Sequence, residues 1–143
     1  MMIRRNKKGF TLVEIMIVVA IIALLAAIAI PNLLRARMSS NDSLAKATLR
    51  AISTAAESFG TANQGQYPTG ANLTALTTAN PPYLNYDYVA NSNVNTPIAG
   101  YYYTASQTVN GYSFVATPTK CNVTGSAVWT IQTGGVLTSG ACQ

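Results

Sequence analysis

Residues 9–31, GFTLVEIMIVVAIIALLAAIAIP, set the architecture that we expect for this chain of 143 residues. The stretch is apolar from Phe10 to Ile30 except for Thr11 and Glu14. As a helix, these 21 residues would span about 31 Å, close to the roughly 30 Å hydrocarbon core of a bilayer. The stretch therefore predicts a membrane-spanning helix that carries one carboxylate near its start.

The positive charge of the chain is concentrated in front of this stretch. Nine Lys and Arg residues against four Asp and Glu residues give a net charge of +5, and four of the nine precede the stretch: Arg4, Arg5, Lys7 and Lys8. Such a cluster keeps the N-terminus of a membrane helix in the cytoplasm and places the rest of the chain outside it. The remaining side chains sum to +1, which is five minus four, so we expect no direct nucleic-acid binding.

The residue inventory argues against an enzyme. The chain has no histidine, which removes the commonest general base and metal ligand. Four carboxylates offer little from which to build an acid–base pair, and no GxxxxGK[ST] or GxGxxG stretch is present. We therefore expect no catalytic residue, no metal site and no cofactor.

Three interpretations of the apolar stretch are open on these grounds. A cleavable secretory signal fits the basic start and the AIA at 27–29, but not the length or Glu14. A plain anchor leaves Glu14 unexplained, because a carboxylate inside a membrane costs about 2.5–3.5 kcal/mol. In the third, cleavage after Gly9 gives Phe10 a free amine one turn from Glu14. The carboxylate then meets the positive end of the helix dipole and an amine of its own or a neighbouring copy, and it sets the register of helices that assemble side by side.

The sequence KKGFTLVEIMIVVAIIALLAAIAIPNLLRAR, residues 7–37, resembles the class III signal of type IV prepilins and of type II secretion pseudopilins. The resemblance covers about the first third of the chain and implies cleavage between Gly9 and Phe10, N-methylation of Phe10 and an assembly role for Glu14. It also implies several partners: further copies of the chain, membrane lipid, a prepilin peptidase/methyltransferase and an inner-membrane assembly platform.

A kinked helix is expected to continue beyond the membrane. Pro31 removes one helical hydrogen bond, so we predict a kink there, which matches the helix interruption of the resembled families. We expect one helix over about residues 11–60, whose C-terminal half packs on the globular part. A new helix starting within SSND at 39–42 is the alternative.

Helical periodicity resumes after the predicted kink. One face is defined by spacings of 4, 4, 3 and 4 at Leu44, Thr48, Ile52, Ala55 and Phe59. Asp42 and Lys46 are expected to pair at i,i+4 on another face. Gly60 is the expected C-terminal cap.

The last part of the chain has the composition of a small sheet with long connections. A turn-rich loop follows residue 61, with one short helix at 72–78. Strands are predicted at 101–106, 112–117, 127–132 and 135–138, with hairpin signals at Asn110-Gly111 and Gly134-Gly135. A short antiparallel sheet with one face on the helix gives an α+β fold, and the resemblance implies the type IV pilin fold. The expected parts are a cleaved leader at 1–9, a membrane or filament-core helix at 10–30, an amphipathic helix at 31–60 and a globular region at 61–143.

Two cysteines lie near the end of the chain. In an exported chain, Cys121 and Cys142 are expected to form one disulfide. Closing a loop of about 20 residues in this way stabilises the folded state by about 3 kcal/mol. Two free thiols in a cytosolic protein are the alternative. The tyrosines at 101–103 are interpreted as ordinary strand residues rather than a ligand platform, and the sequons at Asn72 and Asn122 as chance matches.

The resemblance implies a structural function. We expect a type IV pilin, held in the inner membrane with a cytoplasmic N-terminus and then polymerised into a surface filament. The alternative is a pseudopilin of a periplasmic pseudopilus, and GQYPTG at 65–70 resembles that type. Major pseudopilins usually carry an acidic calcium loop, whereas this chain has no acidic residue after Asp87. A membrane-anchored or secreted binding domain is a more distant alternative.

Overall fold

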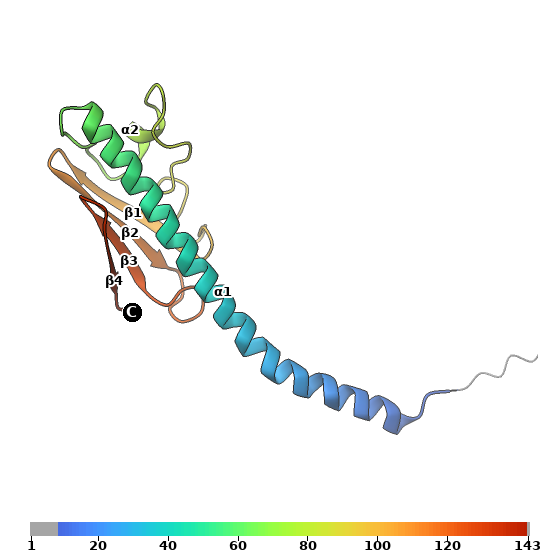
Figure 1. Ribbon diagram of the computed structural model, residues 1–143. Helices are drawn as coiled ribbons and strands as arrows, with labels where there is room; N and C mark the ends of the chain where they lie inside the picture. Colours follow the sequence, from blue (N-terminus) through green and yellow to red (C-terminus); the bar gives the residue numbers. More distant parts are fainter. Residues whose placement is uncertain (1–8, 143) are drawn as a thin grey trace, which may run out of the picture. The chain divides into compact units, whose positions relative to one another are not determined.

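The computed structural model describes residues 9–142, which form two helices and one four-stranded sheet (Figure 1). The helices are α1 (Leu12–Ala62) and α2 (Thr74–Thr77). The strands are β1 (Tyr101–Thr108), β2 (Gly111–Pro118), β3 (Val128–Gln132) and β4 (Val136–Gly140). The predicted α+β class and all four predicted strands are confirmed. The basic residues Arg4, Arg5, Lys7 and Lys8 of the predicted leader lie outside the described residues.

The chain divides into two compact units with the boundary between Arg35 and Ala36. Helix α1 is continuous through Pro31 and through residues 39–42, so the alternative of a separate second helix is wrong. A proline removes only one backbone hydrogen bond of a helix, so the helical segments before and after Pro31 both persist. The kink at Pro31 stays a prediction.

One face of α1 packs against the sheet in the second unit. The buried residues of α1 follow a helical repeat: Asp42, Ala45, Thr48, Leu49, Ile52, Ser53, Ala55, Ala56 and Gly60. The predicted face was wrong at its start, because Leu44 is 48% exposed while Ala45 and Leu49 are buried. Alanine and threonine recur on several faces of this helix. Which of these faces is buried depends on where the sheet packs.

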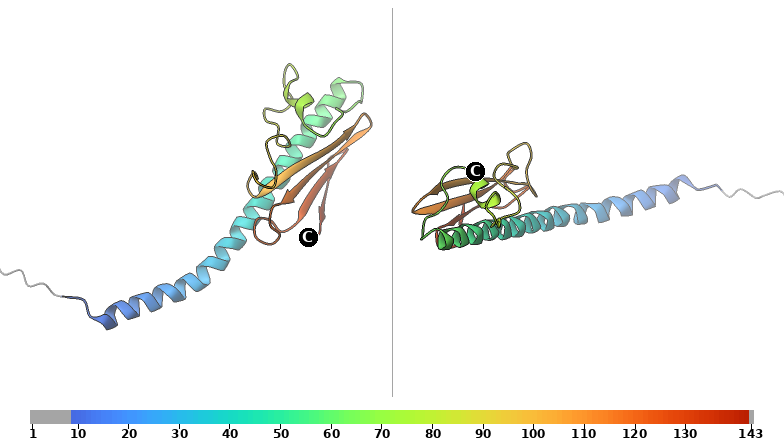
Figure 2. Two further views of the ribbon diagram at one scale, coloured as in Figure 1. Left: turned by 180° about the vertical axis from the view of Figure 1, so that it is seen from behind. Right: turned by 90° about the horizontal axis from the view of Figure 1, so that it is seen from above.

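The sheet is an antiparallel meander in the order β1-β2-β3-β4. Figure 2 shows it lying along the C-terminal part of α1, with its other face uncovered by any helix. Burial alternates along β1, so Tyr101 and Tyr103 are buried and Tyr102 lies on the other face. This confirms the three tyrosines as strand residues. Phe114 of β2 and Ile131 of β3 complete the inner layer.

Both predicted hairpin turns are present, but the residues that form the first turn differ from the predicted ones. The loop between β1 and β2 is Val109-Asn110, because Gly111 already pairs with Thr108. Gly134 and Gly135 lie between β3 and β4 with φ values of 81° and 73°, which favour glycine.

The predicted cap at Gly60 was wrong. Helix α1 runs on to Ala62, and the left-handed residue after it is Gln64, with φ 57°. The amide of Gly65 donates to the carbonyl of Gly60 over 2.8 Å, which is the bond of a Schellman motif. Gly60 has a different role: a Cβ there would lie 3.1 Å from the Tyr67 ring, so glycine lets that ring pack close to the helix.

Candidate assembly segment and the contacts of the globular unit

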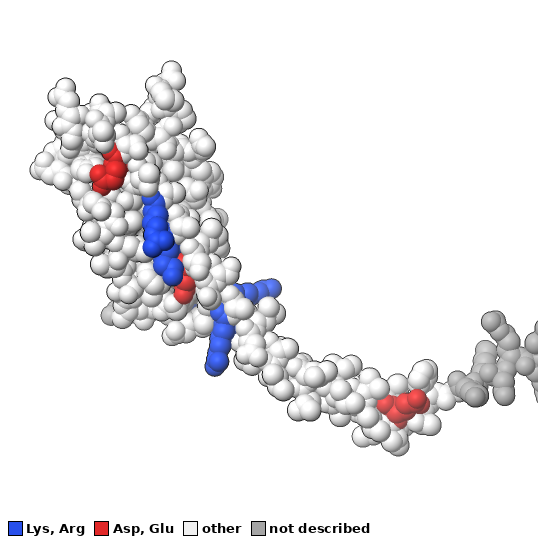
Figure 3. Space-filling model, viewed as in Figure 1, with Lys and Arg blue, Asp and Glu red and all other residues white. Residues whose placement is uncertain are grey.

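The first turns of α1 form an uncovered apolar surface. Every large apolar side chain from Phe10 to Leu34 is exposed, by between 42% and 80%. Figure 3 shows this segment as an almost uninterrupted uncharged surface. By length and composition, α1 is able to cross a membrane, with a best window of mean hydropathy 3.0. An apolar surface of this extent requires lipid or another apolar surface to cover it.

The start of α1 is capped by a contact that the sequence reasoning missed. The Glu14 amide donates to Thr11 Oγ1 over 3.2 Å, and the Ile15 amide donates to the Thr11 carbonyl over 3.3 Å. Thr11 is therefore the N-cap and Glu14 the third helical residue, which are the two positions that a capping box uses. The signal was present in the spacing Thr-x-x-Glu. Glu14 lies in the first turn, where the helix dipole stabilises a negative charge.

The predicted cleavage site precedes this cap. Gly9 and Phe10 are exposed and lie outside the helix. A Cβ on Gly9 would meet no atom within 4 Å, so packing within residues 9–142 does not require glycine there. Cleavage and methylation at this site stay predictions.

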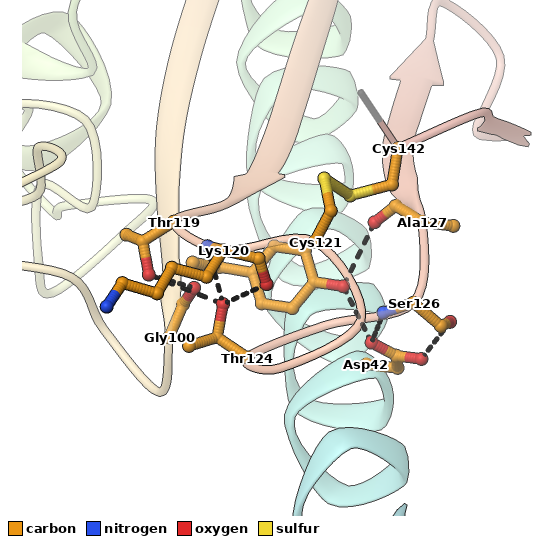
Figure 4. Close-up of a disulfide and its surroundings, with 10 residues drawn as sticks. Asp42, Gly100, Thr119, Lys120, Cys121, Thr124, Ser126, Ala127 and Cys142 are labelled. Carbon is orange, nitrogen blue, oxygen red and sulfur yellow. Dashed lines mark hydrogen bonds between the residues drawn. A yellow bond between two sulfur atoms is a disulfide. The ribbon is translucent and has the colours of Figure 1, made fainter.

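In the second unit, Asp42 joins the helix to the sheet (Figure 4). The Tyr101 hydroxyl donates to Asp42 Oδ1 over 2.6 Å, and the Ser126 amide donates to the same oxygen over 3.1 Å. The Ser126 hydroxyl donates to Oδ2. Burial opposes ionisation of this carboxyl, but the bonds from Ser126 and Tyr101 outweigh it and lower the pKa of Asp42.

The prediction that Asp42 lies with Lys46 on a different face of the helix from the one that packs on the sheet was wrong. Asp42 is only 8% exposed and faces the sheet. Lys46 Nζ lies 4.7 Å from the centroid of the Trp129 ring, which gives a cation–π contact. Lys46 still contributes to the lowered pKa of Asp42, as the smallest of the causes.

Glu57 makes a second polar connection, nearer the C-terminal end of α1. Its Oε1 accepts from the Tyr112 hydroxyl over 2.6 Å and from the Gly134 amide over 2.8 Å. Its Oε2 accepts from the Tyr67 hydroxyl over 2.8 Å. The bond from Tyr112 is the main reason that the pKa of Glu57 is lowered. Burial and the bond to Glu57 raise the pKa of Tyr112 to about 12.

Asp87 organises the long connection between α1 and β1. Its Oδ1 accepts from the amides of Val89 and Ala90, and its Oδ2 accepts from the Leu73 amide over 3.1 Å. Each carboxylate of residues 36–142 therefore accepts hydrogen bonds from the fold itself. Among the described residues, no group of three or more His, Cys, Asp or Glu residues is placed to hold a metal ion.

The predicted disulfide between Cys121 and Cys142 is confirmed, with 5.6 Å between the two Cα atoms. It links the segment after β4 to the loop at 119–127 (Figure 4). The same loop is bound to α1 through Ser126, and through Asn41 Nδ2, which donates to the Thr124 carbonyl over 2.8 Å. The disulfide and the Asp42 contacts therefore hold one loop from two sides.

The comparisons with known proteins concentrate on the N-terminal segment. The family model for the prokaryotic N-terminal methylation motif matches residues 4–30. The type IV wide pilus major component PilA4 of Thermus thermophilus is 62% identical over 45 residues, which are 32% of this chain and 34% of that protein. The type IV major pilin protein PilA of Myxococcus xanthus is 58% identical over 54 residues, 38% of this chain and 24% of that protein.

A third relative is matched over more of the chain. The type II secretion system core protein G of Pseudomonas aeruginosa is 35% identical over 87 residues, which are 59% of this chain and 61% of that protein. The chain spans roughly a third and a quarter of the length of the two pilins above. No solved structure matches the chain. The chain thus carries a prepilin-type methylation motif and resembles type IV pilins and a type II secretion protein, as its sequence predicted.

Proposed function

We propose that this chain is the structural subunit of a bacterial type IV pilus. The observation that carries the proposal is the coincidence of the methylation motif at residues 4–30 with an apolar helix surface that the fold leaves uncovered. In the precursor, lipid covers this surface. In the filament, copies of the same helix cover it, and their burial contributes about 25 cal/mol per Å² of apolar area.

The proposed order of events is insertion, cleavage and assembly. The basic leader keeps the N-terminus cytoplasmic, and a prepilin peptidase/methyltransferase cuts after Gly9 and methylates Phe10. An assembly platform in the inner membrane then adds the subunit to the filament. Hydrophobic burial alone is non-directional, so Glu14 provides the register. Identical contacts that do not close into a ring produce a filament.

A pseudopilin is the second candidate, and one observation favours it. The similarity to the type II secretion protein extends over 87 residues, beyond the 45 and 54 residues matched in the two pilins. Against it, the described residues contain no cluster of three or more acidic, His or Cys side chains that could hold a metal ion, whereas a calcium loop needs several oxygen ligands close together.

Two measurements test the proposal. Mass spectrometry of the mature chain should find an N-terminus at methylated Phe10; a start at Ile30 or an uncut chain would support the membrane-anchored or secreted binding domain. Surface filaments sheared from cells should consist chiefly of this chain. A chain that is processed at Phe10 but absent from surface filaments would support the pseudopilin.

A further inference from the structure

A hollow of about 360 Å³ lies at the C-terminal end of α1. The end of the helix, the loop that follows it, α2 and the β1–β2 loop surround it, and Figure 1 shows these segments gathered at one end of the sheet. Its lining includes Phe59, Asn63, Gln66, Tyr67 and Thr69. All of them belong to the second unit.

The aromatic walls of the hollow are held in place by contacts outside it. The Phe59 ring packs edge-on against Tyr83, with 5.6 Å between centroids. The Tyr67 ring packs against Tyr112 at 5.2 Å, and its hydroxyl is bound to Glu57. The Tyr67 amide donates to the Val109 carbonyl over 3.1 Å, which fastens the wall to the β1–β2 loop. The hollow is therefore preformed, and a ligand would order few side chains on binding.

The rim offers neutral hydrogen-bonding groups. Asn63 Nδ2 donates to the Phe59 carbonyl over 2.8 Å, which fixes the amide and leaves its Oδ1 as an acceptor. The side chains of Gln66 and Thr69 are exposed, and no hydrogen bond of either is found within residues 9–142. None of the lining residues is charged. The rim therefore offers hydrogen-bond donors and acceptors but no charged group.

We propose that this hollow binds one ring of a neutral saccharide. A pyranose has an apolar C–H face, which stacks on an aromatic ring, and hydroxyls at its edge, which both donate and accept hydrogen bonds. Phe59 and Tyr67 offer the first kind of surface, and Asn63, Gln66 and Thr69 offer the second. The volume lies at the lower end of the 300–1,000 Å³ that is usual for ligand sites, which suits a single ring. This activity is additional to the proposed filament function.

Saturation-transfer NMR on the full chain, in a detergent without a sugar headgroup, tests this proposal. The probes are glucose, galactose, mannose, N-acetylglucosamine and N-acetylgalactosamine, with N-acetylneuraminic acid as the charged comparison and phenol as the purely aromatic one. At least one neutral sugar should receive saturation, and the charged sugar should not. Gln66→Ala and Thr69→Ala should each weaken that binding about five-fold, as expected for the loss of a neutral hydrogen bond.

Matched variants outside the hollow serve as controls. Gln132→Ala and Thr104→Ala remove the same kinds of exposed side chain from β3 and β1 and should leave the sugar signal unchanged. The proposal is overturned if no neutral sugar receives saturation, if only phenol does, or if the Gln66 and Thr69 variants bind as the parent does. None of these outcomes affects the filament proposal, because subunit processing and filament composition are measured separately.

Discussion

The hydroxyl of Tyr101 donates a 2.6 Å hydrogen bond to the carboxylate of Asp42, 59 residues earlier in the chain. This bond connects the first strand to the start of the buried face of α1. Glu57 makes the equivalent connection 15 residues further along the helix, through the hydroxyls of Tyr112 and Tyr67. The helix and the sheet are therefore joined by two carboxylate–tyrosine hydrogen bonds, one near each end of their apolar contact.

Removing the Tyr101 hydroxyl should destabilise the second unit. Tyr101→Phe deletes a hydrogen bond to a charged acceptor, and we expect the free energy of unfolding to fall by about 1.5–3 kcal/mol. Chemical denaturation of the full chain in micelles, followed by tryptophan fluorescence, measures this change. Tyr102→Phe is the matched control, because Tyr102 lies on the opposite face of the same strand, and it should change stability little. Equal effects of the two variants would contradict the role of Asp42.

Stability should fall on acidification. The folded pKa values of Asp42 and Glu57 are lowered, so their contribution is complete above the unfolded values, which are about 3.9 for Asp and 4.3 for Glu. It is lost as the pH falls below those values and through the folded pKa values. Denaturation midpoints measured from pH 6 down to about pH 2 should decrease across this window.

The double variant Asp42→Asn/Glu57→Gln provides the control for this pH dependence. It keeps an oxygen acceptor at each position but removes the titrating groups. Its stability should be lower than that of the parent at pH 6 and should depend less on pH below pH 5. A parent-like acid profile in the double variant would assign the acid sensitivity to other groups.

Reduction of the disulfide should loosen the loop at 119–127. Cys121 and Cys142 are 21 residues apart, and closing a loop of this length stabilises a fold by about 3 kcal/mol in the chain-entropy model. Adding a reductant should lower the denaturation midpoint and increase amide hydrogen exchange around Ser126. The Cys121→Ser/Cys142→Ser variant should match the reduced parent and be insensitive to the reductant. A reductant effect that persists in this variant would refute the assignment.

Glu14 should be required for assembly but not for processing. Glu14→Ala removes the carboxylate and leaves the Gly9–Phe10 site in place, so we expect normal cleavage by mass spectrometry and few or no filaments by electron microscopy. Thr11→Ala is the matched control, because it deletes the side-chain cap, worth about 1 kcal/mol, and keeps the carboxylate. Filament loss in Thr11→Ala as complete as in Glu14→Ala would show that the helix start, not the charge, controls assembly.

The helices and strands were accessible from the sequence because their signals are local. The apolar run and the absence of glycine and proline between residues 42 and 59 predicted one helix to about residue 60, and it ends at Ala62. Alternation and turn residues placed every strand end to within about two residues of its observed position. The disulfide followed from the number and position of the cysteines.

The contacts of the carboxylates were not accessible in this way. Asp42 reads as an exposed helix residue with a lysine at i+4, and nothing nearby in the sequence indicates a tyrosine 59 residues later. The exposure of Leu44 depends likewise on which side of the helix the sheet covers. The Thr11–Glu14 cap is different: it is local, and the Thr-x-x-Glu spacing would have revealed it.

The position of this cap has a consequence for processing. Helix α1 begins at Leu12, and no hydrogen bond found within residues 9–142 involves Gly9 or Phe10. Hydrolysis of the proposed Gly9–Phe10 bond thus breaks no hydrogen bond of the helix and leaves its cap intact. If cleavage occurs at that bond, no hydrogen bond found among residues 9–142 has to open for it. The new amine of Phe10 would then form beside a helix start that keeps its Thr11 cap.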